Sequence, residues 1–440
     1  MTFDPTGDAI DHGSVIRAAA ALLVLSMSVA AGCGGDGSAD PVASSSCGSL
    51  LYEGDGEPDL IVVSDFPRRG VGAEATQQMV DAIELVFRRR DFRAGEHRVG
   101  FQSCNDTVGD EPFDAPTCRR NARTYVETQD VIGIIGPWNS GCAVEQIPIV
   151  SRRDAGPLAL ISPSNTFVSL TRTIRGGEPL TPSLYPDGVR SYLRVVTHDL
   201  AQGIAGAYVA ARLGARRVVS LHQDLADDYV RGLALPFAAA ARGLGLEVHE
   251  LEWPVRESYT ALATAVAAQR PDAVYLAGLP NANAKRLIED LRAALGAGVL
   301  LLGPDSFAAE DVAEELGPVG EGMRVTVPGI PPAKLPPAGQ RFLREFGKPP
   351  LASGGPGAPE AAQAADVLLD AIARSDGTRA AVVEELFATK VTNGILGGFS
   401  FDRFGDIVPA PVGVYRFEDG KLTAEDVIRA PLAGLAGLSD

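Results

Sequence analysis

The chain has 440 residues, of which 45% are hydrophobic, and its formal net charge is −17. A single hydrophobic core rarely serves so long a chain, so we expect two domains. A chain this acidic repels nucleic acid and anionic lipid head groups, which excludes a general role in nucleic-acid binding.

Residues 1–32 are predicted to form a signal peptide. Arg17 precedes a short apolar stretch, residues 18–31, which is too short to span a bilayer. The stretch ends in "AAGC", which resembles a bacterial lipobox with Cys33 as the acylated residue; an ordinary signal peptide with a nearby cut is the alternative. We therefore expect an exported protein held at the membrane by a lipid, with residues 33–56, rich in Gly, Ser, Asp and Pro, as a flexible linker.

The cysteine count favours disulfides outside the cytoplasm. If Cys33 carries lipid, four cysteines remain, an even number that suits two disulfides and allows three pairings: Cys47, Cys104, Cys118 and Cys142. A metal site is the alternative interpretation. No C-x-x-C motif occurs and the five histidines show no ligand spacing, so we expect no metal.

Short apolar runs alternate with longer amphipathic ones in two series. Strands are predicted at 60–64, 98–103, 131–136 and 158–162, with helices around Met79–Phe87, 117–128 and 143–152. A second series has strands at 192–196, 217–222, 246–251, 273–278 and 298–303, with helices at 201–213, 228–242, 259–269 and 282–295. Continuous apolar strands alternating with helices indicate parallel sheets covered on both faces, hence two α/β domains of similar build.

The remaining segments are predicted to be less regular. Residues 171–190 are rich in Pro and Gly and are expected to form a surface flap. After a strand-like run at 323–329 come helices near 336–346 and 359–373, and the tail from residue 397 has strands broken by turn residues. Such a tail favours antiparallel strands.

The loop "PWNSGC", residues 137–142, is the first candidate for a site. It follows an apolar strand and precedes a helix, and ligands of open parallel sheets bind beyond the carboxyl ends of the strands. Free backbone N–H groups at a helix start can hold a carboxylate, Gly141 allows close approach, and Ser140 adds a hydroxyl. The alternative is an N-cap and a turn without a ligand.

Several segments in order resemble one family. The strand-Gly-Pro-x-x-Ser-Gly loop is followed by "ISPSNTFVSLT" (161–171), "VTHDLAQGIAGAYVA" (196–210), "HQDLADDYVRG" (222–232), "LLGPDSF" (301–307) and "GGFSFDRFGD" (397–406). From about residue 57 to 420 this set is similar to the bacterial periplasmic leucine/isoleucine/valine-binding proteins, the type I solute receptors of ABC importers.

The resemblance implies a fold with two doubly wound parallel-sheet lobes, joined by a three-strand hinge and closing on ligand like a Venus flytrap. The first lobe would comprise residues 57–197 and 328–392, and the second residues 198–327 and 393–440. It also implies an extracytoplasmic receptor for a small zwitterion such as a branched-chain amino acid, with an ABC transporter permease as its partner.

Carried over position by position, the resemblance gives a set of ligand-binding residues. The first lobe would hold the ligand's carboxylate with Ser140, the amides around Gly141, Asn165 and Thr166. Facing residues from the second lobe would be Asp199, Tyr229 and Asp305, the last where the best-known receptors carry the longer Glu. Trp138 would line the cleft beside the ligand's side chain, or it would pack at the hinge.

Two further implications concern charge and disulfides. Arg68 and Arg69 stand near where the family's cleft opens; solvated side chains are the alternative, and an arginine in the cleft would favour an acidic ligand. The family's known bridge suggests Cys104–Cys142, which leaves Cys47–Cys118, while Cys104–Cys118 is the competing local pairing.

Two other functions remain as hypotheses. A secreted hydrolase lacks support, since the chain has no G-x-S-x-G elbow, no Walker G-K-[ST] and no G-x-G-x-x-G after a strand. We therefore expect neither an enzyme nor a cofactor. A ligand-sensing lipoprotein that signals to a membrane partner would use the same cleft as an importer's receptor.

Overall fold

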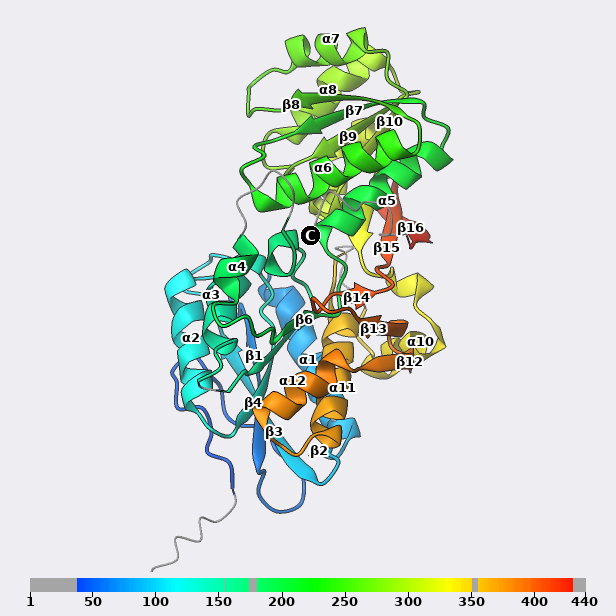
Figure 1. Cartoon of the computed structure of the whole chain (residues 1–440). Helices are drawn as coiled ribbons and strands as arrows, with labels where there is room; N and C mark the ends of the chain where they lie inside the picture. Colours follow the sequence, from blue (N-terminus) through cyan, green and yellow to red (C-terminus); the bar gives the residue numbers. More distant parts are fainter. Residues whose placement is uncertain (1–37, 155, 174–179, 350–354, 430–440) are drawn as a thin grey trace, which may run out of the picture. The chain divides into compact units, whose positions relative to one another are not determined.

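The computed structural model describes residues 38–154, 156–173, 180–349 and 355–429 (Figure 1). Signal peptide, lipid attachment at Cys33 and the first residues of the expected linker lie outside these ranges. The chain from residue 37 onward forms one unit, in which two large sheets and a small one carry the helices. Among the described residues, no helix is both long and apolar enough to cross a bilayer.

The first lobe is built on a six-stranded sheet in the order β2-β3-β1-β4-β5-β6. The strands are β1 (Leu60–Phe66), β2 (Arg93–Ala94), β3 (His97–Asn105), β4 (Val131–Ile135), β5 (Ala159–Ser162) and β6 (Tyr192–Arg194). All neighbours run parallel except the β2–β3 hairpin. The sheet confirms the parallel arrangement that the apolar runs predict.

Helices cover both faces of this sheet. Alternate residues of β1 point to opposite sides: Val62 joins a core with α1 (Ala73–Arg89) and α11 (Ala358–Arg374), whereas Ile61 and Val63 join a core with α2 (Ala115–Glu127) and α3 (Ser140–Val150). Because both faces are buried, the strands read as continuous apolar runs. The smaller elements of this lobe are η1 (Val168–Leu170), α4 (Leu180–Leu184), η4 (Pro332–Lys334), α10 (Pro337–Phe346) and α12 (Arg379–Phe387).

The second lobe is built on a seven-stranded sheet in the order β16-β15-β11-β10-β9-β7-β8. Its strands are β7 (Arg217–His222), β8 (Glu247–Glu252), β9 (Ala273–Ala277), β10 (Leu300–Gly303), β11 (Arg324–Pro328), β15 (Val412–Glu418) and β16 (Lys421–Ile428). One face carries α5 (Asp199–Arg212) and α6 (Asp228–Gly243); the other carries α7 (Thr260–Ala268), α8 (Ala284–Leu295) and α9 (Glu310–Leu316), with η2 (Asp305–Phe307) and η3 (Gly317–Gly320). The last two strands are antiparallel, as the turn-rich tail predicts.

The chain passes between the lobes after β6, after β11 and after a small three-stranded sheet (Figure 1). That sheet consists of β12 (Lys390–Gly394), β13 (Gly397–Phe401) and β14 (Ile407–Val408). Phe399, Phe401 and Ile407 are buried in the same core as α1 and α11. The last passage therefore follows β14 and not residue 392, where we expected it, because these apolar side chains are buried in the core of the first lobe.

The expectation of a flexible linker over residues 33–56 is wrong for its described part, residues 38–56. Ala39 and Val42 are buried, and the N–H of Val42 donates to Gln102 Oε1 at 2.9 Å. The main chain of Leu51 exchanges two hydrogen bonds with Phe101 on β3. The segment thus covers the edge of β3 beyond the short β2, where unpaired backbone groups would otherwise be exposed.

All four cysteines of the described residues form disulfides, but not in the pairings we expected. The bonds are Cys47–Cys104 and Cys118–Cys142, so the predicted Cys104–Cys142, Cys47–Cys118 and Cys104–Cys118 are all wrong. Cys104 ends β3 beside the N-terminal segment, whose fold the sequence did not predict. Cys118 on α2 and Cys142 on α3 meet because these two helices pack side by side on one face of the sheet.

The described part of the expected surface flap at 171–190 packs against the first lobe. Residues 174–179 lie outside the described residues, but Tyr185 is buried and its hydroxyl donates to Leu170 O at 2.8 Å. Helix α12 was not predicted. Neither the described part of residues 171–190 nor α12 lines the cavity described next.

Candidate functional site

A cavity of about 1160 Å³ lies at the carboxyl ends of strands from both lobes. Its first-lobe wall comes from the loops after β1, β4 and β5, and its second-lobe wall from residues after β7, β9 and β10. It is lined by Gly70–Ala75, Trp138–Ser140, Ser164, Thr166, Phe167, Asp227, Tyr229, Leu279, Asp305, Ser306, Ala308–Asp311, Gly355 and Pro356. This is the edge at which open α/β sheets bind their ligands.

Ser140 and Thr166 meet at the first-lobe wall. Ser140 is the first residue of α3, and its Oγ accepts hydrogen bonds from the N–H groups of Thr166 at 3.2 Å and Phe167 at 3.4 Å. Ser140 and Thr166 each retain a little exposed surface, and both line the cavity. The wall therefore presents the side-chain hydroxyls of Ser140 and Thr166 beside the start of α3, and hydroxyl donors suit an anionic group.

Gly141 and Asn165, also predicted to bind ligand, do not line the cavity. The N–H of Gly141 donates to Asn139 Oδ1 at 2.8 Å, and a Cβ at this position would lie 2.5 Å from the ring of Phe113. Asn165 is fully buried and its Nδ2 donates to the carbonyls of Pro137 and Trp138. Both residues shape the two loops that present Ser140 and Thr166.

Trp138 lies in the loop between β4 and α3, and it lines the cavity next to the start of α1. A Cβ at Gly72, which has φ of 84°, would lie 2.9 Å from the Trp138 ring, so the glycine permits this close packing. Arg68, by contrast, donates to Ser103 Oγ at 2.6 Å and Gln77 Oε1 at 2.7 Å and does not line the cavity. Its guanidinium is thus engaged with its own lobe.

Asp305 is the centre of the second-lobe wall. Its Oδ1 accepts hydrogen bonds from the Tyr229 hydroxyl at 2.7 Å and from Gln202 Nε2 at 3.0 Å. Burial raises the pKa of Asp305 above its ordinary value, and these two donors partly oppose that rise. Gln202 was missed by sequence reasoning because a glutamine within a helix has no pattern that marks it as buried; its Nε2 also donates to Thr326 O at 2.7 Å.

Asp199 lies behind the cavity wall. It is the first residue of α5, is fully buried, and its N–H donates to Thr166 O at 2.9 Å. Burial, and then the nearby Asp305, raise the pKa of Asp199 well above its ordinary value, while Thr166 partly opposes the rise. Asp305 thus disfavours ionisation of Asp199, and a cation bound next to Asp305 would weaken this effect.

A direct contact joins the lobes beside the cavity. Ser169 Oγ on η1 donates to Asp228 Oδ2 at 2.6 Å, and Asp228 also pairs with Arg231 on the same helix. A Cβ at Gly232 would lie 3.3 Å from Val168 Cγ2 of the first lobe. The described residues are thus in an arrangement in which the lobes touch at η1 and α6.

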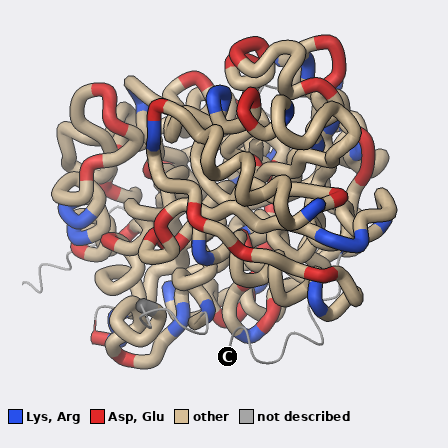
Figure 2. The backbone as a smooth tube through the Cα atoms, turned by 90° about the horizontal axis from the view of Figure 1, so that it is seen from above, with Lys and Arg blue, Asp and Glu red and all other residues tan. Residues whose placement is uncertain are grey.

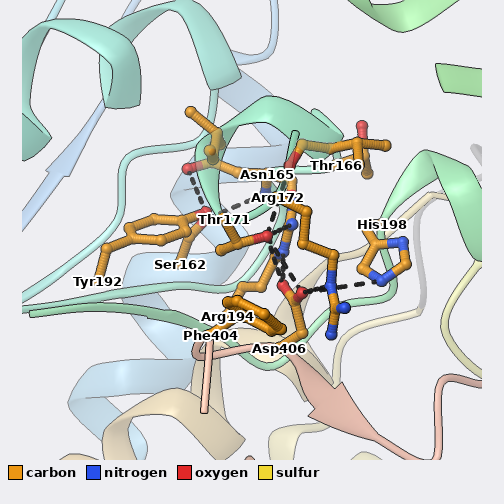
Figure 3. A network of polar contacts seen from close by, with 12 residues as sticks. Ser162, Asn165, Thr166, Thr171, Arg172, Tyr192, Arg194, His198, Phe404 and Asp406 are labelled. Atoms are coloured by element: carbon orange, nitrogen blue, oxygen red, sulfur yellow. Dashed lines mark hydrogen bonds and ion pairs between the residues drawn. The ribbon is translucent and has the colours of Figure 1, made fainter. Parts of the chain in front are cut away.

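The passages between the lobes meet in a buried polar network (Figure 3). Asp406 accepts hydrogen bonds from Arg194 Nε at 2.7 Å, Arg172 Nε at 2.6 Å and Thr171 Oγ1 at 3.0 Å. Burial opposes ionisation of Asp406, but Arg194, His198 and Arg172 overcome it and hold its pKa below the usual range. The network ties the first passage, after β6, to the third, which follows Asp406.

His198 extends this network toward the second lobe. Its Nδ1 accepts the N–H of Ala201 at 3.3 Å and so caps α5, while its Nε2 faces Asp406 Oδ2 at 3.8 Å. Burial, only partly offset by Asp406, lowers the pKa of His198 to about 4. The ring is therefore neutral at pH 7, with Nε2 as the protonated nitrogen because Nδ1 acts as an acceptor.

One group of potential metal ligands occurs in the described residues. The carboxylate of Asp106 lies within 4.8 Å of the sulfurs of Cys118 and Cys142. Those sulfurs are bonded to each other, so neither is available as a thiolate.

Two α/β lobes, three connecting passages and a cavity between the strand ends define a protein that encloses a small solute. Residues 66–421 match the family model of the periplasmic binding proteins, and the chain belongs to that family. The resemblance and the fold expected from the sequence are thereby confirmed. A search of curated proteins finds no match.

Solved structures with the same fold include receptors for different ligands. The leucine-binding protein LivK of Thermotoga maritima is 24% identical, with a TM-score of 0.65, and the match covers 84% of this chain and 99% of that one. LivJ of Streptococcus pneumoniae, in complex with isoleucine, is 18% identical with a TM-score of 0.62 and coverage of 84% and 99%. An ABC transporter solute-binding protein of R. palustris, in complex with benzoate, is 18% identical with a TM-score of 0.60 and coverage of 84% and 96%. At these identities the likeness shows the fold alone.

Proposed function

We propose that this protein is the extracytoplasmic receptor of an ABC importer and that it binds a small zwitterion, most simply an amino acid. The observation that carries the proposal is the opposite chemistry of the two cavity walls. Ser140 and Thr166 offer hydroxyls, which suit a carboxylate, whereas Asp305 and Tyr229 offer a carboxylate and a phenol, which suit an ammonium group. A ligand that has both a carboxylate and an ammonium group would bridge the two walls.

Closure on such a ligand suits delivery to a permease. The ligand's charged ends would be enclosed against fixed dipoles of both lobes, and the closed form differs in shape from the empty one. Lipid on Cys33 would keep the receptor at the outer face of the membrane. The same cleft would also serve a sensing lipoprotein; finding permease and ATPase genes beside this one would favour the importer.

Asp305 provides the direct test. Replacing it with Ala would leave the ligand's ammonium group unpaired in the enclosed cavity, which should cost roughly 2–5 kcal/mol, or about 30-fold or more in affinity. Thermal-shift screening of amino acids, short amides and simple carboxylic acids identifies the ligand, and calorimetry then compares wild type with Asp305→Ala and Asp305→Asn. Asp55→Ala removes an exposed carboxylate outside the cavity and serves as the control.

The outcomes separate the hypotheses clearly. Stabilisation only by uncharged sugars or purely anionic acids, or unchanged affinity in Asp305→Ala, would contradict the zwitterion assignment. Recovery of a chemically altered ligand after incubation would instead indicate an enzyme.

A further inference from the structure

The charged side chains that line the cavity, among the residues that the structure describes, are all acidic. They are Glu74 from the first lobe and Asp227, Asp305, Glu310 and Asp311 from the second, and no described Lys or Arg lines the cavity. Elsewhere acidic and basic residues are interspersed along the chain, as seen from above in Figure 2. The cavity therefore concentrates negative charge beyond what the net charge of the protein alone requires.

These carboxylates are not neutralised by partners. Among the described residues, none of the five forms an ion pair, whereas many other acidic residues pair with arginine, as Asp366 does with Arg90. Glu74, Glu310 and Asp311 are exposed in the first turns of α1 and α9, and Asp227 caps α6. A helix N-terminus carries only about half a positive charge, so these helix starts do not cancel the acidic groups.

Most of the other lining residues are aromatic or small; Val71, Asn139 and Leu279 are the larger non-aromatic ones. Trp138 and Phe167 provide rings, and glycines and alanines on both sides leave room. At about 1160 Å³ the cavity is larger than most small-molecule pockets, which occupy roughly 300–1,000 Å³. Aromatic faces together with unpaired carboxylates are the surroundings that favour organic cations.

We infer that the ligand carries a second cationic group, so that it is an amino acid with an ammonium or guanidinium side chain. This inference rests on the proposed function, because the zwitterionic end would occupy Ser140, Thr166 and Asp305. Glu74, Glu310 and Asp311 then face the cationic side chain from both lobes. Salt weakens attraction between exposed charges, so the preference for a cation decreases as ionic strength rises.

The test compares arginine with citrulline, its uncharged counterpart of nearly equal shape, together with leucine and glutamate. Calorimetry on the purified full-length protein should give an affinity for arginine about tenfold or more above that for citrulline at low salt, as expected for attraction to two or more exposed carboxylates. The triple variant Glu74→Gln, Glu310→Gln and Asp311→Asn should bring the arginine-to-citrulline ratio close to one.

A matched control removes three acidic charges outside the cavity. Glu57→Gln, Glu314→Gln and Glu315→Gln replace exposed residues, two of them on α9 itself, and should leave the ratio unchanged. The inference would be overturned if the arginine-to-citrulline affinity ratio were near one in the wild type, or if the triple variant left that ratio unchanged. Either result would show that the acidic residues interact only with the N-termini of their helices. If leucine or citrulline nevertheless binds in an Asp305-dependent manner, the proposed function survives; if no amino acid binds, both fail.

Discussion

Removing the carboxylate of Asp406 should destabilise the protein more than removing any exposed acidic residue. Asp406 and Arg194 are both almost completely buried, and their side chains meet at 2.7 Å. Without Asp406, Arg172 can still pair with Asp402, but Arg194 would keep its charge in the interior with no carboxylate bonded to it.

The magnitude follows from what Arg194 retains. Removing one partner of a buried ion pair costs about 3–5 kcal/mol. Arg194 loses the hydrogen bond from its Nε, but its two terminal nitrogens still donate to the carbonyls of Asn165 and Phe167 and to Thr171 Oγ1, so the loss should lie near about 3 kcal/mol. Asp406→Asn keeps the shape but not the charge, and it should lose a similar amount.

Urea unfolding at neutral pH measures this loss. Trp138 in the first lobe and Trp253 in the second give one fluorescence probe for each lobe. The control is Asp426→Ala, which breaks an exposed pair with Arg212 and should change the free energy of unfolding by less than about 1 kcal/mol. A loss in Asp406→Ala no greater than that of the control would refute the reasoning.

The pH dependence of this difference has a defined sign. Since the pKa of Asp406 in the folded protein is lowered below its ordinary value of 3.8, its ionisation stabilises the fold at any pH above that value. The advantage of wild type over Asp406→Asn should persist at pH 5. It should shrink only as the pH falls from 3.8 toward the lowered pKa.

Three other measurements test separate parts of the structure. Peptide mapping without reduction should find Cys118 bonded to Cys142, and replacing both with Ala should lower the free energy of unfolding by roughly 2–4 kcal/mol; a Cys104–Cys142 peptide would contradict the structure. Because the pKa of Asp305 is raised and an ammonium ligand favours its ionised form, ligand affinity should rise from acidic to neutral pH; calorimetry showing the opposite trend would exclude this role. Cys33→Ser should release the protein from membranes and leave its precursor uncut, whereas processing and fractionation like wild type would mean that Cys33 is not lipidated.

The sequence was most informative where a pattern is local. Continuous apolar runs predicted the strands, and the carboxyl end of one strand gave Ser140; the family resemblance added Thr166, Tyr229 and Asp305, and all four line the cavity. Position relative to a strand end is a property of a few neighbouring residues, so it can be read from one sequence.

What depends on distant partners could not be predicted in this way. Residues 38–56 have the composition of a linker, yet their order comes from backbone pairing and a disulfide with β3, some fifty residues away in sequence. Gln202 has its role only because α5 packs next to Asp305. Asn165 was expected at the ligand, but its amide is used by carbonyls of a neighbouring loop.

The N-terminal segment also determines where a mechanical load enters the molecule. Cys47 is joined covalently to β3, the second strand of the first sheet, and Leu51 is paired with the same strand. Tension applied to the chain ahead of residue 38, for example by attachment to a sensor chip, would therefore be transmitted to the first lobe and would bypass the passages between the lobes. A protein immobilised by its N-terminus would be held through its first lobe, and the load would not act directly on the second lobe.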